Sequence, residues 1–229
     1  MERLENFEQK NNIIFKNKNL LKQAFIHRSY LNENRDLGIG HNERLEFLGD
    51  AVLELVVTDY LYNKYTSKTE GELTAYRSAL VNANTLSSVA TNIGINELLF
   101  LSKGEAKDKG RARQVILADT FEAVIGAIYM DQGYESAKNF IAQNLFGMTD
   151  DIVSNGLWID SKSRFQEKAQ DRLGVTPAYK TIKEEGPDHD KKFTVGVFVG
   201  SDLVASGSGK SKQEAEQEAA KRALESRGW

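Results

Sequence analysis

The spacing of apolar residues changes along this chain, and that change constrains its fold more than any other feature of the sequence. From about residue 18 to residue 146, apolar residues recur at steps of three and four, which predicts successive helices. After residue 160 a short helical pattern is followed by KKFTVGVFVG (residues 191–200), where apolar residues alternate with a period of two and predict a strand. Flanking patterns add two further strands and a final Ala-rich helix. We therefore expect an all-α domain followed by an α+β domain of order α-β-β-β-α.

The boundary between the two domains is predicted at GMTDDIVSNGLW, residues 147–158. This stretch contains Gly, Asp, Ser and Asn without a sustained hydrophobic period, which is typical of a connecting segment. We expect a first domain over residues 1–147, a linker over 148–158 and a second domain over 159–229.

Composition excludes several classes of site. The 229 residues include no cysteine, which excludes disulfides, thiolate nucleophiles and zinc sites built on sulfur. Three scattered histidines, His27, His41 and His189, predict no metal cluster, so a bound metal would need oxygen ligands. The formal net charge of −3 does not by itself indicate a nucleic-acid-binding protein. No apolar run approaches the ~18 residues of a membrane span, and MERLENFEQKNN lacks a signal-peptide core, so we expect a cytoplasmic protein without a membrane partner.

Two pairs of carboxylates lie within otherwise apolar helical patterns. Glu46 and Asp50 are spaced i,i+4, and Asp119 and Glu122 are spaced i,i+3, so each pair shares one helical face. An unpaired carboxylate in apolar surroundings costs several kcal/mol or takes up a proton. A divalent cation would remove this cost, and oxygen ligands alone favour Mg²⁺, or Mn²⁺ as a substitute.

Other interpretations of these acids stay open on spacing alone. A charge in a helix usually lies on a solvated face, although two such pairs on two apolar helices make this less convincing. The acids could also pair with Arg44 or Arg77 in a structural network. Spacing assigns Glu54 and Asp59 to the surface or to helix ends.

Four segments of the first domain resemble the ribonuclease III family: AFIHRSYLNE, HNERLEFLGDAVL, TEGELTAYRSALVN and LADTFEAVIGAIYMD. The resemblance implies that Glu46, Asp50, Asp119 and Glu122 form an Mg²⁺ site. It also implies that Glu43 and Glu70 are further members of an acidic valley. All four principal acids are present, which argues against a catalytically inactive relative.

The family resemblance implies an Mg²⁺-dependent endoribonuclease that acts on double-stranded RNA without a small-molecule cofactor. It would leave 5′-phosphate and 3′-hydroxyl ends with short 3′ overhangs, in the processing of structured precursors of rRNA, mRNA and also tRNA. Asp50 and Glu122 are candidates for orienting or deprotonating the attacking water, and Glu46 and Asp119 chiefly for binding the metal. The alternative is a non-catalytic protein that binds double-stranded RNA and uses its acidic helices structurally.

The second domain resembles the double-stranded RNA-binding domain in DSKSRFQEKAQ, GPDHDKKFTVGVFV and GSGKSKQEAEQEAAKRAL. Such domains read the shape of A-form RNA through 2′-hydroxyls and phosphates. The positions implied for RNA binding are Ser163, Gln166, Glu167, His189, Lys210, Ser211 and Lys212. Gln213 and Glu216 depart from the family pattern, because many members place a basic residue at the first position and some at the second. On the other interpretation, Lys210 and Lys212 are solvated charges and His189 is an ordinary loop residue.

A homodimer is also expected. A duplex has two antiparallel strands related by two-fold symmetry, so two copies of one site could cut both strands. Supporting this, the helix of the first motif is apolar around much of its circumference, through Phe47, Leu48, Val52, Leu55 and Val56. Neighbouring helices of the same chain could cover these residues instead, and periodicity does not decide between the two.

Overall fold

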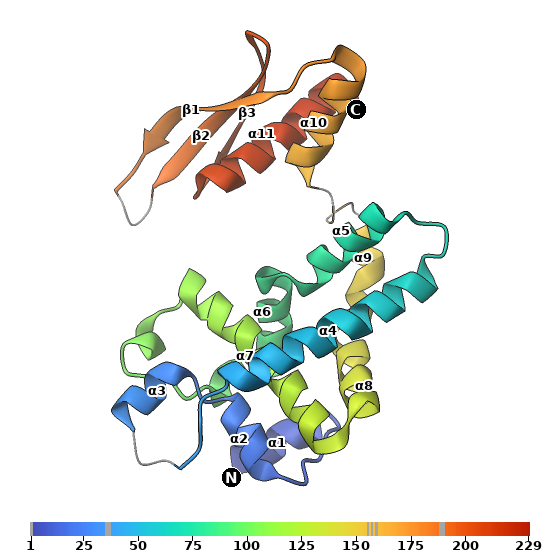
Figure 1. The fold of residues 1–229 in the computed structure, drawn as a ribbon. Coiled ribbons are helices and arrows are strands. Elements are labelled where there is room, and N and C mark those ends of the chain that lie inside the picture. The colour runs from blue at the N-terminus through green and yellow to red at the C-terminus, as the bar shows by residue number, and fades with distance from the viewer. Residues whose placement is uncertain (1, 35–37, 155, 157, 159, 188–190) are drawn as a thin grey trace. The chain divides into compact units, whose positions relative to one another are not determined.

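The computed structural model describes residues 2–34, 38–154, 156, 158, 160–187 and 191–229 (Figure 1). The chain forms two compact units, residues 1–158 and 159–229. In the described part of the chain, no helix has both the length and the apolar character needed to cross a membrane.

The first unit is built from helices, as the three-to-four-residue spacing predicts. Its elements, in chain order, are α1 (Glu2–Lys10), α2 (Lys18–Ala24), α3 (Arg28–Glu33), α4 (Glu43–Lys64), α5 (Glu70–Val81), α6 (Ala83–Asn92), the 3-10 turns η1 (Asn96–Leu98) and η2 (Glu105–Lys107), α7 (Arg111–Gln132), α8 (Tyr134–Leu145), η3 (Phe146–Met148) and α9 (Thr149–Ser154).

Side-chain caps determine where several helices begin. Thr69 and Glu72 form a reciprocal capping box at the start of α5, and Asn82 accepts a hydrogen bond from the Thr85 N–H at the start of α6. Such caps satisfy backbone N–H groups that have no partner within the helix.

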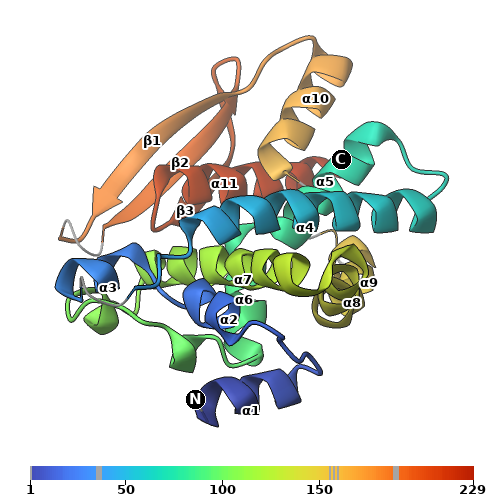
Figure 2. The same ribbon diagram turned by 60° about the horizontal axis from the view of Figure 1, so that its bottom comes forward.

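Helix α7 is the centre of the first unit. Residues 123–128 of α7 are buried without interruption, so neighbours cover this helix on nearly every side. The long helix α4 packs against α7: the two cross in Figure 1 and run alongside each other in Figure 2. Because the predicted acidic pairs lie on these two helices, their packing determines the geometry of the site.

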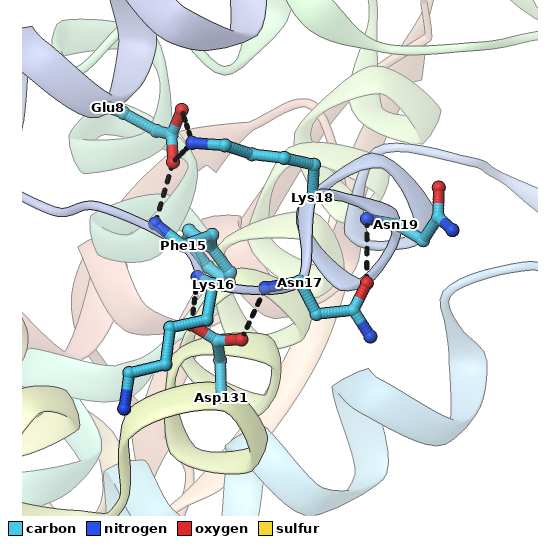
Figure 3. A network of polar contacts seen from close by, with 7 residues as sticks. All are labelled: Glu8, Phe15, Lys16, Asn17, Lys18, Asn19 and Asp131. Carbon is cyan, nitrogen blue, oxygen red and sulfur yellow. Dashed lines mark hydrogen bonds and ion pairs between the residues drawn. The ribbon is translucent and has the colours of Figure 1, made fainter.

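A polar network fastens the N-terminal segment to the end of α7 (Figure 3). The buried Glu8 carboxylate accepts a hydrogen bond from the Phe15 N–H at 2.7 Å and forms an ion pair with Lys18 at 2.6 Å. Asp131, near the C-terminal end of α7, accepts hydrogen bonds from the backbone N–H groups of the two residues before Lys18. These contacts hold α1 and α2 against the helix that carries Asp119 and Glu122.

The stretch predicted as a linker, residues 148–158, is partly helical where the structure describes it. It contains α9, whose Ile152 is buried in the core of the first unit. The Trp158 ring packs edge-on against Tyr76, with ring centroids 4.8 Å apart. A few apolar anchors therefore attach this polar segment to the first unit, although its composition resembles a connector.

The second unit has the predicted order α-β-β-β-α. Its elements are α10 (Ser161–Leu173), β1 (Ala178–Glu185), β2 (Lys192–Val199), β3 (Asp202–Gly209) and α11 (Lys212–Arg227). The strands form an antiparallel sheet in the order β1-β2-β3, and both helices cover one face of it (Figure 1).

The core of the second unit lies between this sheet and its helices. It contains Phe165 of α10, Val197 of β2 and the alanines of α11. A Cβ at Gly207 of β3 would lie 2.6 Å from the Ala215 carbonyl oxygen, so this glycine permits close packing of α11 on the sheet.

Candidate metal centre and nucleic-acid surface

Two glycines bring α4 and α7 into backbone contact. A Cβ at Gly49 would lie 2.6 Å from the Glu122 carbonyl carbon and closer still to its oxygen. A Cβ at Gly126 would lie 2.9 Å from the Leu45 carbonyl carbon, so neither helix accepts a side chain at the crossing. Neither glycine was predicted to matter from the sequence. The signal in the sequence was a glycine in the middle of each apolar helix. Glycine has a low helix propensity, so its presence there indicates a packing or functional role.

The crossing brings together three of the four predicted metal ligands. Carboxylate oxygens of Glu46, Asp119 and Glu122 all lie within 4.8 Å of one another, and each side chain is half-buried. Asp50 is one turn further along α4, is exposed and does not belong to this group of three. The i,i+4 and i,i+3 spacings thus identified one face of α4 and one face of α7, and these two faces contact each other.

The electrostatics of the cluster are unfavourable without a cation. Burial, followed by the charge of Asp50, raises the pKa of Glu122 to about 8. Burial, followed by the charge of Asp119, raises the pKa of Glu46 to about 7. Burial also raises the pKa of Asp119. A cation bound by these oxygens would offset the repulsion among the carboxylates and favour their charged forms.

Arginines do not neutralise the cluster in the described part of the chain. There, none of its three carboxylates forms an ion pair, and neither does Asp50. Arg77 pairs instead with Glu54, at 2.9 Å. Arg44 is exposed and, among the described residues, forms no ion pair with these acids. The described residues therefore contain no structural network of these acids with Arg44 or Arg77, and the all-oxygen donor set fits Mg²⁺ or Mn²⁺.

A pocket of about 370 Å³ opens beside Glu46 and Asp119. Glu43 lines this pocket, and its Oε1 lies 3.5 Å from Nη1 of Arg28. The arginine therefore partly offsets the negative charge at this edge of the pocket. Glu70 is exposed at the start of α5 and lines a different pocket. Within one chain, Glu43 therefore borders the cluster and Glu70 does not.

The second unit presents most of the predicted RNA-binding residues at its surface. Ser163, Gln166 and Glu167 are exposed on α10. Lys210 and Lys212 are exposed at the start of α11, whereas His189 lies outside the described residues.

Several of these side chains already have partners within the domain. The hydroxyl of Ser211 is the N-cap of α11 and accepts a hydrogen bond from the Glu214 N–H at 3.2 Å. Lys212 forms an ion pair with Glu184 at 3.1 Å. Glu216, which departs from the family pattern, pairs with Lys162 at 2.6 Å.

The apolar residues of α4 are divided between the core of the first unit and its surface. Phe47 and Leu55 are 81% and 59% exposed, and Tyr62 on the same helix is 71% exposed. Val52 and Val56 are buried by their own chain, and Leu48 is half-buried against the same core. Of the two interpretations that the sequence left open, coverage by the same chain therefore holds for Val52 and Val56, because α4 packs inside the unit on that side.

Comparison with known proteins gives matches over both units. A family model described as Ribonuclease-III-like matches residues 17–149, and the double-stranded RNA binding motif matches residues 161–227. Ribonuclease 3 from Pelotomaculum thermopropionicum is 46% identical over 212 residues, which is 93% of this chain and 88% of that protein. Ribonuclease 3 from Enterococcus faecalis is 46% identical over 214 residues, with 93% of each chain covered.

A solved structure agrees for the first unit. The nuclease domain of ribonuclease III from Campylobacter jejuni is 39% identical, with a TM-score of 0.55, and the match covers 62% of this chain and 97% of that one. These relatives carry the names of nucleases, so the alternative of a non-catalytic RNA-binding protein is not supported. The chain belongs to the ribonuclease III family of endoribonucleases and joins a helical nuclease domain to a double-stranded RNA-binding domain.

Proposed function

We propose that Glu46, Asp50, Asp119 and Glu122 form an Mg²⁺-dependent site that hydrolyses phosphodiester bonds of double-stranded RNA. The observation that carries this proposal is the convergence of three half-buried carboxylates from α4 and α7 without an ion pair in the described part of the chain. Mn²⁺ would substitute, because it accepts the same hard oxygen ligands.

A divalent cation at such a site supplies Lewis-acid chemistry, because it acidifies water and offsets charge on the phosphate. Glu46 and Asp119 would chiefly bind the cation. Asp50 and Glu122 would orient the attacking water and accept its proton. Cleavage of the bond from phosphorus to the 3′ oxygen would leave a 5′-phosphate and a 3′-hydroxyl.

The RNA-binding residues would position the duplex. Ser163, Gln166 and Glu167 project from α10, where their polar ends can exchange hydrogen bonds with 2′-hydroxyls. Lys210 and Lys212 lie at the start of α11, where cationic side chains and unpaired backbone N–H groups both favour phosphate. His189 stays a candidate for the adjacent minor groove. We further propose that the substrates are structured precursors of rRNA, mRNA and tRNA in the cytoplasm.

A homodimer would let two such sites cut opposite strands with a stagger and leave short 3′ overhangs. The exposed Phe47, Leu55 and Tyr62 on α4 support a contact between two copies, because exposed apolar side chains on one helix favour burial. The nuclease domain from Campylobacter jejuni is likewise described as having a flexible region involved in dimer formation. Glu43 and Glu70 are proposed as further acids along the path of the RNA.

The test is Glu122→Gln, which keeps the shape of the side chain and removes the charge that binds the cation. This variant should retain duplex binding and lose most hydrolysis, as measured by gel shift and by cleavage of a labelled duplex. Glu54→Gln is the matched control, because Glu54 is a glutamate of the same unit that pairs with Arg77 rather than joining the cluster. Near-normal turnover of Glu122→Gln at saturating Mg²⁺, or equal losses in both variants, would count against the assignment.

A further inference from the structure

Glu184 contacts two lysines at the edge of the proposed phosphate-binding surface. One oxygen, Oε1, lies 3.1 Å from the Lys212 ammonium, and the other, Oε2, lies 3.7 Å from the Lys191 ammonium. Glu184 pairs across the β1–β2 ladder with Phe193, and the Lys212 ammonium also lies 5.6 Å from the centre of the Phe193 ring. One cation from α11 and one from the residue before β2 therefore converge on one carboxylate of β1.

Lys212 occupies a position that suits phosphate. It is the first residue of the sixteen-residue helix α11, next to backbone N–H groups that attract anions. Two further acids described near this helix end have other partners: Glu214 accepts a hydrogen bond from the Lys210 N–H at 2.8 Å, and Glu216 pairs with Lys162. Among the described residues, Glu184 is thus the acid that shares Lys212 with any phosphate this lysine binds.

The ionisation of Glu184 agrees with this arrangement. The hydrogen bond from Lys212, together with the nearby charge of Lys191, lowers the pKa of the Glu184 carboxyl. Glu184 therefore carries its negative charge at neutral pH. A carboxylate between two ammonium groups occupies the kind of position that a phosphate oxygen of a duplex backbone would take.

We propose that Glu184 competes with the phosphates of double-stranded RNA for Lys212 and Lys191, and thereby limits duplex affinity and its dependence on salt. This inference rests on the proposed contact between Lys212 and phosphate. The opposite role, in which Glu184 holds Lys212 in a productive position, predicts the opposite sign for its removal.

The experiment uses the full chain carrying Glu122→Gln, with chelator present, so that the duplex stays intact during binding measurements. Fluorescence anisotropy gives the Kd for one RNA duplex over a series of salt concentrations. Glu184→Gln should tighten binding about 3- to 10-fold at low salt and steepen the slope of log K against log salt by about 1.

Glu185→Gln is the matched control. Glu185 is the next residue of β1, points to the other side of the strand and pairs with Lys183 at 2.7 Å. Glu185→Gln changes the net charge of the chain by the same amount as Glu184→Gln. If the effect at Glu184 is local, Glu185→Gln should therefore change Kd less than about 2-fold. Equal tightening by both variants would overturn the proposal in favour of a general charge effect.

Lys212→Gln separates this inference from the function on which it rests. Lys212→Gln should weaken duplex binding and flatten the salt slope. Glu184→Gln should tighten binding less in a chain that also carries Lys212→Gln than in a chain that keeps Lys212, because the two residues are coupled. Weaker binding by Lys212→Gln with no gain, or a loss, from Glu184→Gln would overturn the role of Glu184 alone. No effect of Lys212→Gln would overturn both the phosphate contact and the competition.

Discussion

Replacing Gly49 by alanine would place a methyl group against the backbone of α7. The new Cβ would lie 2.6 Å from the Glu122 carbonyl carbon, whereas ordinary contact begins at 3.4 Å. The two helices would have to separate by at least about 0.8 Å, because backbone atoms cannot rotate away as a side chain can. That separation moves Glu46 away from Asp119 and Glu122.

The size of the effect follows from this displacement. Overpacking typically costs about 1–3 kcal/mol, and the better helix propensity of alanine returns at most about 1 kcal/mol. The free energy of unfolding should therefore fall by up to about 3 kcal/mol, and by less where the gain in helix propensity is fully realised. A misplacement of about 1 Å at reacting groups can lower the rate about 100-fold, so activity should fall much more than stability.

Gly71→Ala is the control, because a Cβ at Gly71 in α5 would meet no atom within 4 Å. Urea unfolding measures stability, and cleavage of a labelled duplex at saturating Mg²⁺ measures activity. Gly71→Ala should leave activity unchanged and stability equal or slightly higher. Unchanged stability and activity in Gly49→Ala would refute the inference that the crossing at Gly49 positions the carboxylates.

Three other predictions concern pH, domain boundaries and association. Because the pKa values of Glu46 and Glu122 are raised to about 7 and about 8, from 4.5, the folded metal-free chain binds more protons than the unfolded chain between about pH 5 and 8. Its free energy of unfolding should therefore fall as pH rises through that window, and Mg²⁺ should raise Tm more at pH 8 than at pH 6; calorimetry showing equal Mg²⁺ effects would contradict this. A fragment ending after Trp158 should fold, bind duplex more weakly and show a shallower salt dependence than the full chain. A fragment ending at Phe146 should melt at a lower temperature than the longer one, because it lacks the buried part of α9, and equal melting temperatures by circular dichroism would count against that packing. Phe47→Ser should be monomeric at micromolar concentration in light scattering while the parent chain is dimeric; a dimer in both would exclude Phe47 as an anchor of the contact.

The sequence predicted those features that depend on local spacing. Glu46 and Glu122 were identified because i,i+4 and i,i+3 steps place residues on one helical face, and both faces meet at the α4–α7 crossing. The alternation around Val195 and Val197 likewise identified the buried side of β2.

Features that depend on contacts between distant segments were missed. The helix α9 was taken for a linker, because its burial depends on neighbours that its polar composition does not reveal. The burial of Val52 by its own chain was left undecided, since a helix that is apolar all round does not show which side its own domain covers. The contact of Lys212 with Glu184 joins residues 28 positions apart in sequence, and no periodicity in the chain indicates it.

The most direct test of the central claim is cleavage of a long RNA duplex, labelled on both strands, by the full chain with Mg²⁺ and with chelator. We predict cuts on both strands with a fixed stagger, 5′-phosphate and 3′-hydroxyl ends, and no cleavage once the cation is removed. Equal cleavage in chelator, or RNA that stays intact with Mg²⁺ although it is bound, would contradict a metal-dependent nuclease site at Glu46, Asp50, Asp119 and Glu122.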